Sequence, residues 1–213
     1  MLELGLKVLI AYLLGAMLGS MLLGALRGVD IRRMGSGNAG ATNALRTQGK
    51  FFAIAVLAID IFKGLLAVKW LPAAQFWGIA TDAGVDRHWL ALACGMAVIV
   101  GHVYPIWFGF RGGKGVATVL GVVGALAPVL LLPVIASWLV VLSVSGYVGL
   151  ASMLAGLGLV AGAYWLQPGD TPLLLFCMGV TLFIVYTHRS NIVRMRDGRE
   201  HRLRGGLFPF RAA

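Results

Sequence analysis

Charged residues are scarce in this sequence. Only 12% of its 213 residues are Asp, Glu, Lys or Arg, while 59% are hydrophobic and the mean hydropathy is +0.87. A water-soluble globule cannot bury so much apolar surface, which excludes the soluble classes of protein. Because one crossing of a bilayer takes roughly 20 apolar residues, the length leaves room for about five to seven spans. We therefore predict an all-α, polytopic integral membrane protein.

Acidic residues and cysteines are scarce as well. Eight Asp and Glu stand against 18 Lys and Arg, which gives a formal net charge of +10. This balance suggests nucleic acid in a soluble protein, but here the basic residues lie between or after apolar runs, where membrane orientation and anionic lipid both explain them. Cys94 and Cys177 each stand alone in an apolar run. We predict neither a disulfide nor a metal site, and no cofactor.

The apolar runs predict seven transmembrane helices. Glu3 precedes the first run and Arg27 follows it, the reverse of a signal peptide, so we expect this run to be retained as a helix. The stretch 116–166 is interrupted by little more than Pro128 and Pro133, so its helices are expected to be short. The predicted helices are Leu4–Leu26, Phe51–Leu71, Trp89–Phe108, Val116–Leu132, Val134–Gly146, Val148–Leu166 and Pro172–Thr187.

The distribution of Lys and Arg predicts the orientation. These residues concentrate in segments 27–50, 111–114 and 189–211, and the other loops hold few of them. Under the positive-inside rule the N-terminus is then outside and the C-terminus cytoplasmic. Since no repeat, linker or soluble segment is visible, residues 1–213 are predicted to form a single membrane-embedded domain.

Asparagine occurs at only three positions. Asn38, Asn43 and Asn191 all lie on the predicted cytoplasmic face, in segments that also carry basic and hydroxyl residues. A connector that only had to be soluble would not need this restriction. We predict that three segments form one composite site: "GSGNAGATNALR" at 35–46, "GHVYPIWFGFRGGKGVAT" at 101–118 and "THRSNIVRMRDGRE" at 187–200.

The first of these segments has the composition of a phosphate-binding loop. Its glycines allow backbone amides to turn toward one point, and Arg46 adds a planar cation. A Gly-rich turn that caps the following helix, with Thr42 or Asn43 as N-cap, explains the loop equally well. The neutral donors of the segment are Ser36, Asn38, Thr42 and Asn43.

The second segment places a lysine among glycines ahead of a helix. Gly112, Gly113 and Gly115 surround Lys114 directly before the apolar run at Val116, so backbone amides, a helix N-terminus and an ammonium group converge. It is not a Walker A loop, because the spacing is too short and glycine follows the lysine, so the segment does not support ATP hydrolysis. A purely topological role for the basic residues is the alternative.

Two histidines are candidate site residues. His102 lies near the inner end of the third span, where a lone membrane histidine is more often a packing residue than a base. His188 is followed within two turns by Asn191 and Arg194, which can face a common anion. A basic helix end lying on lipid headgroups explains that cluster as well.

Asp60 and Lys63 lie in mid-span, three residues apart on one helix face. Intramembrane charges usually pair, so we favour a structural ion pair over direct substrate contact. The sequence has no HxxxxD acyltransferase box, no Ser nucleophile elbow and no paired-carboxylate metal motif. The predicted site is rich in cations and poor in general bases. It therefore suits the binding of phosphorylated substrates, while the group that removes a substrate proton has to come from outside this set of residues.

The three segments resemble the motifs of the bacterial acyl-phosphate:glycerol-3-phosphate acyltransferases, the PlsY family. Order, spacing and nearly the whole chain length agree, and "DIFKG" at 60–64 is similar to a further family element. The resemblance implies transfer of a fatty acyl group from acyl phosphate to the sn-1 hydroxyl of glycerol 3-phosphate, giving lysophosphatidate and phosphate. It also implies seven helices in the bacterial cytoplasmic membrane and an active site on the cytoplasmic face.

The resemblance also implies which residues form the site. We expect Lys114 with its glycine amides to hold one phosphate, Arg46, His188 and Asn191 to hold the other, and Ser36 or Asn38 to polarise the acyl carbonyl. Either a substrate phosphate oxygen or His102 would accept the proton of the hydroxyl. The expected catalytic residues are Ser36, Asn38, His102 and Lys114; the expected substrate-binding residues are Gly37, Thr42, Asn43, Arg46, Lys63, Gly113, Gly115, His188, Asn191 and Arg194.

One segment departs from the family pattern. Where relatives often carry a basic residue and a serine, this chain has Gly146 and Gly149, so the contribution of that loop to substrate binding is open.

A transporter of phosphate or of a phosphorylated solute is the rival function, and a lipid-binding scaffold is a third. The expected partners are acyl phosphate, glycerol 3-phosphate and membrane lipids, with a functional link to an enzyme that makes acyl phosphate; we expect a monomer and no nucleic acid.

Overall fold

The computed structural model describes residues 1–203, and every regular element in this range is helical. The chain divides into two compact units, the first ending at Pro128 and the second beginning at Val129. The prediction that the whole chain forms one domain stays a prediction.

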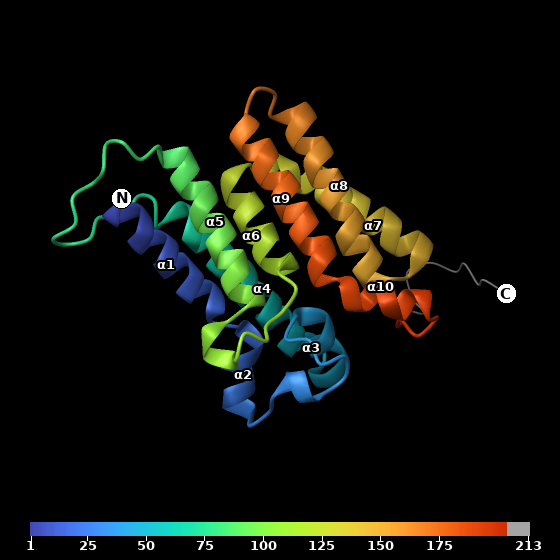
Figure 1. Cartoon of the computed structure of the whole chain (residues 1–213). Helices are drawn as coiled ribbons and strands as arrows, with labels where there is room; N and C mark the ends of the chain where they lie inside the picture. Colours follow the sequence, from blue (N-terminus) through green and yellow to red (C-terminus); the bar gives the residue numbers. More distant parts are fainter. Residues whose placement is uncertain (204–213) are drawn as a thin grey trace. The chain divides into compact units, whose positions relative to one another are not determined.

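The first unit is built around two pairs of closely packed helices. In the first pair, α1 (Leu2–Ala16) packs against α5 (Arg87–Val103); in the second, α4 (Lys50–Lys69) packs against α6 (Val116–Leu126) (Figure 1). Glycine allows both approaches, since a Cβ atom on Gly101 would lie 2.1 Å from the Tyr12 carbonyl oxygen. One on Gly121 would lie 1.9 Å from that of Ile61. Small residues at helix contacts are typical of membrane proteins.

Short elements connect these helices. They are α2 (Gly19–Arg27), the 3-10 helix η1 (Ile31–Arg33), α3 (Ala41–Gln48) and the 3-10 helix η2 (Ile106–Phe108). Both α2 and α3 pack on α4. Buried Ile31, Ala44 and Phe52 form a small apolar core beneath the first polar segment, so that segment is supported by packed structure rather than hanging free in solvent.

The second unit consists of α7 (Leu131–Ser145), α8 (Val148–Leu166), α9 (Thr171–Thr187) and α10 (Arg189–Arg196). Helix α8 lies between α7 and α9 and contacts both, while α10 contacts α8 and α9. Along α7 large apolar side chains are exposed, among them Val140 and Val144. An apolar face of this kind is stable in lipid and not in water.

Helix lengths agree with a membrane protein but differ in detail from the predicted spans. Within residues 1–203, four helical stretches are long and apolar enough to cross a membrane: Lys50–Lys69, Arg87–Phe108, Pro128–Ser145 and Val148–Leu166. Two bent pairs, α1 with α2 and α9 with α10, raise this number to six if each pair is one span. Helix α6 is shorter and apolar. The count of seven crossings and the orientation stay predictions.

Two of the predicted spans differ most from the structure. The first span is not continuous, because α1 and α2 are separated by Met17 and Leu18 and bent by 42°. The span predicted over Val116–Leu132 ends at Leu126, and the 3-10 helix η3 (Pro128–Leu130) follows. Pro128 lacks an N–H group and disfavours helical geometry in the residue before it, which ends α6 there.

Candidate active site

The side chain of Asn43 organises the first polar segment. Its Oδ1 accepts a hydrogen bond from the Ser36 amide at 2.9 Å, and its Nδ2 lies within 3.0 Å of the carbonyl oxygens of Ile31, Met34 and Asn38. Asn43 is buried. One amide group thus ties together both ends of the 31–38 segment, so its visible role is to shape the loop.

The other candidate residues of this segment lie at its surface. Ser36, Gly37 and Arg46 are exposed, and Asn38 and Thr42 are half-buried. The N-cap of α3 is Gly40 and that of α4 is Gly49, neither with a side-chain cap, so the alternative that Thr42 or Asn43 caps the second predicted helix is wrong. Asn38 instead accepts a hydrogen bond from the Gly40 amide at 2.7 Å. The segment therefore exposes a hydroxyl group and an arginine, and the N-terminus of α3 has no side-chain cap.

Arg32, three residues before this segment, contacts the second one. Its Nε and Nη2 donate to the Asp30 carboxylate at 3.0 and 2.8 Å, and its Nη1 donates to the carbonyl oxygens of Phe108 and Arg111 at 3.1 and 3.4 Å. The guanidinium also lies 5.3 Å from the centre of the Phe108 ring. The hydrogen bonds from Arg32 lower the pKa of the Asp30 carboxyl. Sequence reasoning treated Arg32 only as an orientation signal, because its partners in the second segment lie more than 70 residues away.

The second segment folds back on the end of α5. The amides of Gly112 and Gly113 donate to the carbonyl oxygens of Val103 and His102, both at 3.1 Å. Gly115 follows with φ of +89° and is the N-cap of α6, with no side-chain cap. Since a left-handed φ favours glycine, the residue type is required at this turn. Half-buried Lys114 lies between the glycine turn and the helix N-terminus, the arrangement expected for a phosphate.

His102 and Lys63 are both buried, at 2% and 3% exposure. The Lys63 ammonium group donates to the carbonyl oxygens of Gly15 and Met17 at 2.7 and 3.1 Å and lies 3.0 Å from Asp60 Oδ1. Three partners use its three N–H donors. These contacts favour the structural ion pair over the substrate contact that was the alternative for Lys63.

The third segment lies in the second unit. Nδ1–H of His188 donates to the Ile184 carbonyl oxygen at 2.8 Å, and both residues are buried. The Glu200 carboxylate accepts hydrogen bonds from Asn191 Nδ2 at 2.8 Å and Arg194 Nε at 2.6 Å. Glu200 thus orients two predicted phosphate-binding residues, a role that sequence reasoning did not assign to it.

Gly149 is explained by the same cluster. A Cβ atom at this position would lie 2.9 Å from Nδ2 of Asn191. Glycine at position 149 therefore has a steric reason in this chain, because the start of α8 approaches the Asn191 side chain closely.

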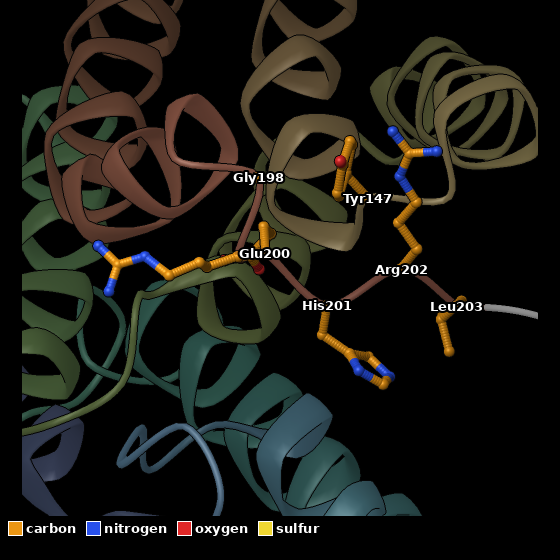
Figure 2. A pocket seen from close by; sticks show the side chains of 7 residues that line it. Tyr147, Gly198, Glu200, His201, Arg202 and Leu203 are labelled. Atoms are coloured by element: carbon orange, nitrogen blue, oxygen red, sulfur yellow. The ribbon is translucent and has the colours of Figure 1, made fainter.

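An open cavity of about 700 Å³ adjoins this cluster (Figure 2). Residues 198–203 line it together with Tyr147, over whose ring the Arg202 guanidinium lies at 4.7 Å. None of the predicted site residues lines this cavity, but Asn191 and Arg194 donate hydrogen bonds to Glu200, which does line it. Over the described residues, no group of three or more His, Cys, Asp or Glu is placed to hold a metal ion.

The structure brings the predicted residues together in two groups. In the first unit, Arg32 contacts the second segment from just before the first one. In the second unit, His188 lies at the junction of α9 and α10, and Asn191 and Arg194 on α10 share the Glu200 carboxylate. That all three segments form one site stays a prediction.

Comparisons with known proteins decide the family. A sequence model of the glycerol-3-phosphate acyltransferases matches residues 5–198. The chain belongs to the glycerol-3-phosphate acyltransferase family. The acyltransferase of Aquifex aeolicus is 39% identical over 201 residues, covering 92% of this chain and 96% of the relative. That of Synechococcus elongatus is 42% identical over 199 residues, covering 92% of each chain.

Solved structures agree with this assignment. The chain is similar to the crystal structure of PlsY, an integral membrane glycerol 3-phosphate acyltransferase, in its glycerol 3-phosphate form. The TM-score is 0.82 and the sequence identity 36%, and the match covers 94% of this chain and 95% of that one. The lysophosphatidic acid form of PlsY matches with a TM-score of 0.80. The resemblance, the all-α integral membrane class and the acyltransferase class are thereby confirmed, and the transporter and scaffold alternatives lose their support.

Proposed function

We propose that this acyltransferase moves a fatty acyl group from acyl phosphate to the sn-1 hydroxyl of glycerol 3-phosphate. The carbon–oxygen bond between acyl group and phosphate breaks, an ester bond forms, and the products are lysophosphatidate and inorganic phosphate. The observation that carries the proposal is the pair of glycine-rich segments in the first unit, which Arg32 links and which supply two helix N-termini, Lys114 and Arg46. Both proposed substrates bring a phosphate to such a surface.

The residues divide into phosphate-binding and carbonyl-polarising groups. Lys114, with the amides around Gly113 and Gly115, is proposed to hold one phosphate, and exposed Ser36 with Asn38 to polarise the acyl carbonyl. Arg46 is a further proposed phosphate ligand. In the second unit the proposed phosphate-binding residues are His188, Asn191 and Arg194.

The hydroxyl proton needs an acceptor. His102 is buried, and a Cβ atom on Gly113 would lie 2.1 Å from its Nε2, so backbone covers this nitrogen. That burial favours transfer of the proton to a phosphate oxygen of the substrate, and the phosphate then leaves as its protonated form. If His102 is not the base, His102→Ala is expected to keep a measurable rate whose pH profile does not lose a limb near the pKa of histidine.

The donor is identified by direct comparison. Purified protein in lipid is supplied with glycerol 3-phosphate and, in separate reactions, with palmitoyl phosphate, palmitoyl-CoA or palmitoyl carrier protein. We expect lysophosphatidate from palmitoyl phosphate alone. Product from palmitoyl-CoA at a similar rate would contradict the choice of donor, and no product from any donor would refute the activity.

We further propose that the enzyme lies in the bacterial cytoplasmic membrane with the glycine-rich segments facing the cytoplasm, as the Lys and Arg bias indicates. A cysteine introduced in place of Gly84, in a loop of the other predicted face, should react with an impermeant maleimide from outside the cell, and one in place of Arg199 should not. The reverse pattern would invert the orientation. The monomeric state and the link to an enzyme that produces acyl phosphate stay predictions.

A further inference from the structure

The break between α1 and α2 leaves backbone groups that need partners. Helix α1 ends at Ala16 and α2 begins at Gly19, with a bend of 42°, and Leu18, the N-cap residue of α2, makes no side-chain hydrogen bond to that helix. In a membrane span, water does not satisfy the freed carbonyl and amide groups, so side chains or neighbouring helices have to do so.

Asp60 and Lys63 on α4 supply both kinds of partner. The Lys63 ammonium group donates to carbonyl oxygens at the end of α1, and Asp60 Oδ1 lies 3.3 Å from the amide of Gly19, the first residue of α2. The cation thus meets the negative end of one helix dipole and the anion meets the positive end of the next. The Asp60–Lys63 pair thus supplies partners for backbone groups on both sides of the break.

Asp60 also faces a residue that this role does not explain. Its Oδ1 lies 3.5 Å from Nδ1 of His102, and that buried nitrogen makes no hydrogen bond within the described part of the chain. On the far side of the ring, Nε2 lies against Gly113, whose amide donates to the His102 carbonyl oxygen at 3.1 Å. The imidazole therefore lies between the Asp60 carboxylate and the glycine turn that precedes Lys114.

We propose that Asp60 is a positioning residue for acyl transfer. It fixes the ring of His102, and the ring supports the backbone of Gly113 and Lys114 in the shape that receives a substrate phosphate. Carboxylates that orient an imidazole through Nδ1 are a common means of holding a histidine in one tautomer and one orientation. This inference rests on the proposed function, because it gives the glycine turn a phosphate to receive.

A double-mutant cycle between Asp60 and His102 tests the proposal. In His102→Gln the side-chain amide can replace Nε2 but not Nδ1, so this variant removes the contact with Asp60 and keeps the side that faces Gly113. Asp60→Asn removes the carboxylate with little change of shape. We expect each single variant to lower kcat/KM for both substrates roughly tenfold. The double variant should have a kcat/KM about equal to that of the worse single variant, because the two residues act through the same contact.

Two further variants separate positioning from stability. Asp60→Asn leaves the Lys63 charge buried without its partner and can therefore prevent folding. If it does, the variant that combines Asp60→Asn with Lys63→Met takes its place in the cycle, because it removes both charges. Glu3 is the matched control, because it forms another buried ion pair in the same unit, with Lys7 at 2.8 Å. Glu3→Gln is expected to lower thermal stability and to leave kcat/KM within about twofold.

A spectroscopic measurement tests the same contact without activity. In protein labelled with nitrogen-15 in its four histidines, the His102 signal, assigned through His102→Gln, should show a protonated Nδ1 that shifts in Asp60→Asn and not in Glu3→Gln. Losses that multiply in the double variant, or an unshifted signal, would overturn the positioning role. A wild-type protein that forms no lysophosphatidate from acyl phosphate would refute the proposed function instead, and the His102 signal would still be readable.

Discussion

Replacing Asn43 by Ala should disorder the loop that carries Ser36 without unfolding the enzyme. The change removes one acceptor and two N–H donors that together hold four backbone groups within 3.0 Å. At about 0.5–1.5 kcal/mol for each of these three side-chain groups, the loop loses about 1.5 to 4.5 kcal/mol. Since water can reach part of the exposed segment and replace some of these bonds, we expect a loss near the low end, about 2 kcal/mol, which corresponds to a fall in kcat/KM of about 30-fold.

The assay also separates two roles for Asn43. A residue that shapes the loop should affect kcat/KM for acyl phosphate and for glycerol 3-phosphate alike, whereas a ligand to one phosphate should raise the KM of one substrate only. Gln48→Ala in the same helix is the control, because its amide contacts only the Met34 sulfur, at 3.5 Å among the described contacts. Activity of Asn43→Ala above half that of the wild type, with both KM values unchanged, would refute the reasoning.

Three other changes test the surroundings of the site. Gly113→Ala puts a Cβ atom 2.1 Å from Nε2 of His102, so the glycine turn has to move and kcat/KM should fall roughly tenfold or more. Gly149→Ala meets the end of the Asn191 side chain at 2.9 Å, which can shift more easily, so we expect a loss of about two- to fivefold, seen as a higher KM. Arg32→Lys keeps the charge but loses the forked contacts to the neighbouring loop, and should lower kcat/KM about tenfold.

Steady-state kinetics on purified protein checks all three changes. Gly5→Ala is the steric control, because nothing lies within 4 Å of a Cβ atom there. If Gly113→Ala behaves like this control, the glycine turn does not need its observed shape. Wild-type kinetics in Arg32→Lys would show that the link between the two segments is dispensable.

The sequence by itself determined the class of protein and the chemistry of its loops. Membrane insertion follows from composition alone, since apolar surface of this extent has to leave water wherever the chain folds. The donor-rich segments around Asn38 and Lys114 were also visible, because backbone turns of glycine and the charge of lysine are local properties. Helix α4 was predicted almost to the residue, as a long apolar run with clear ends.

Only the tertiary structure decided which polar groups serve the fold and which are exposed at the surface. Asn43 and Arg46 look alike as loop donors in the sequence, yet the first is buried among carbonyl oxygens and the second is exposed. The break after Ala16 was not predicted, because no proline marks it in the sequence. The groups that stabilise it, Asp60 and Lys63, lie on another helix. Such pairings are set by packing between distant segments, and no local pattern of residues records them.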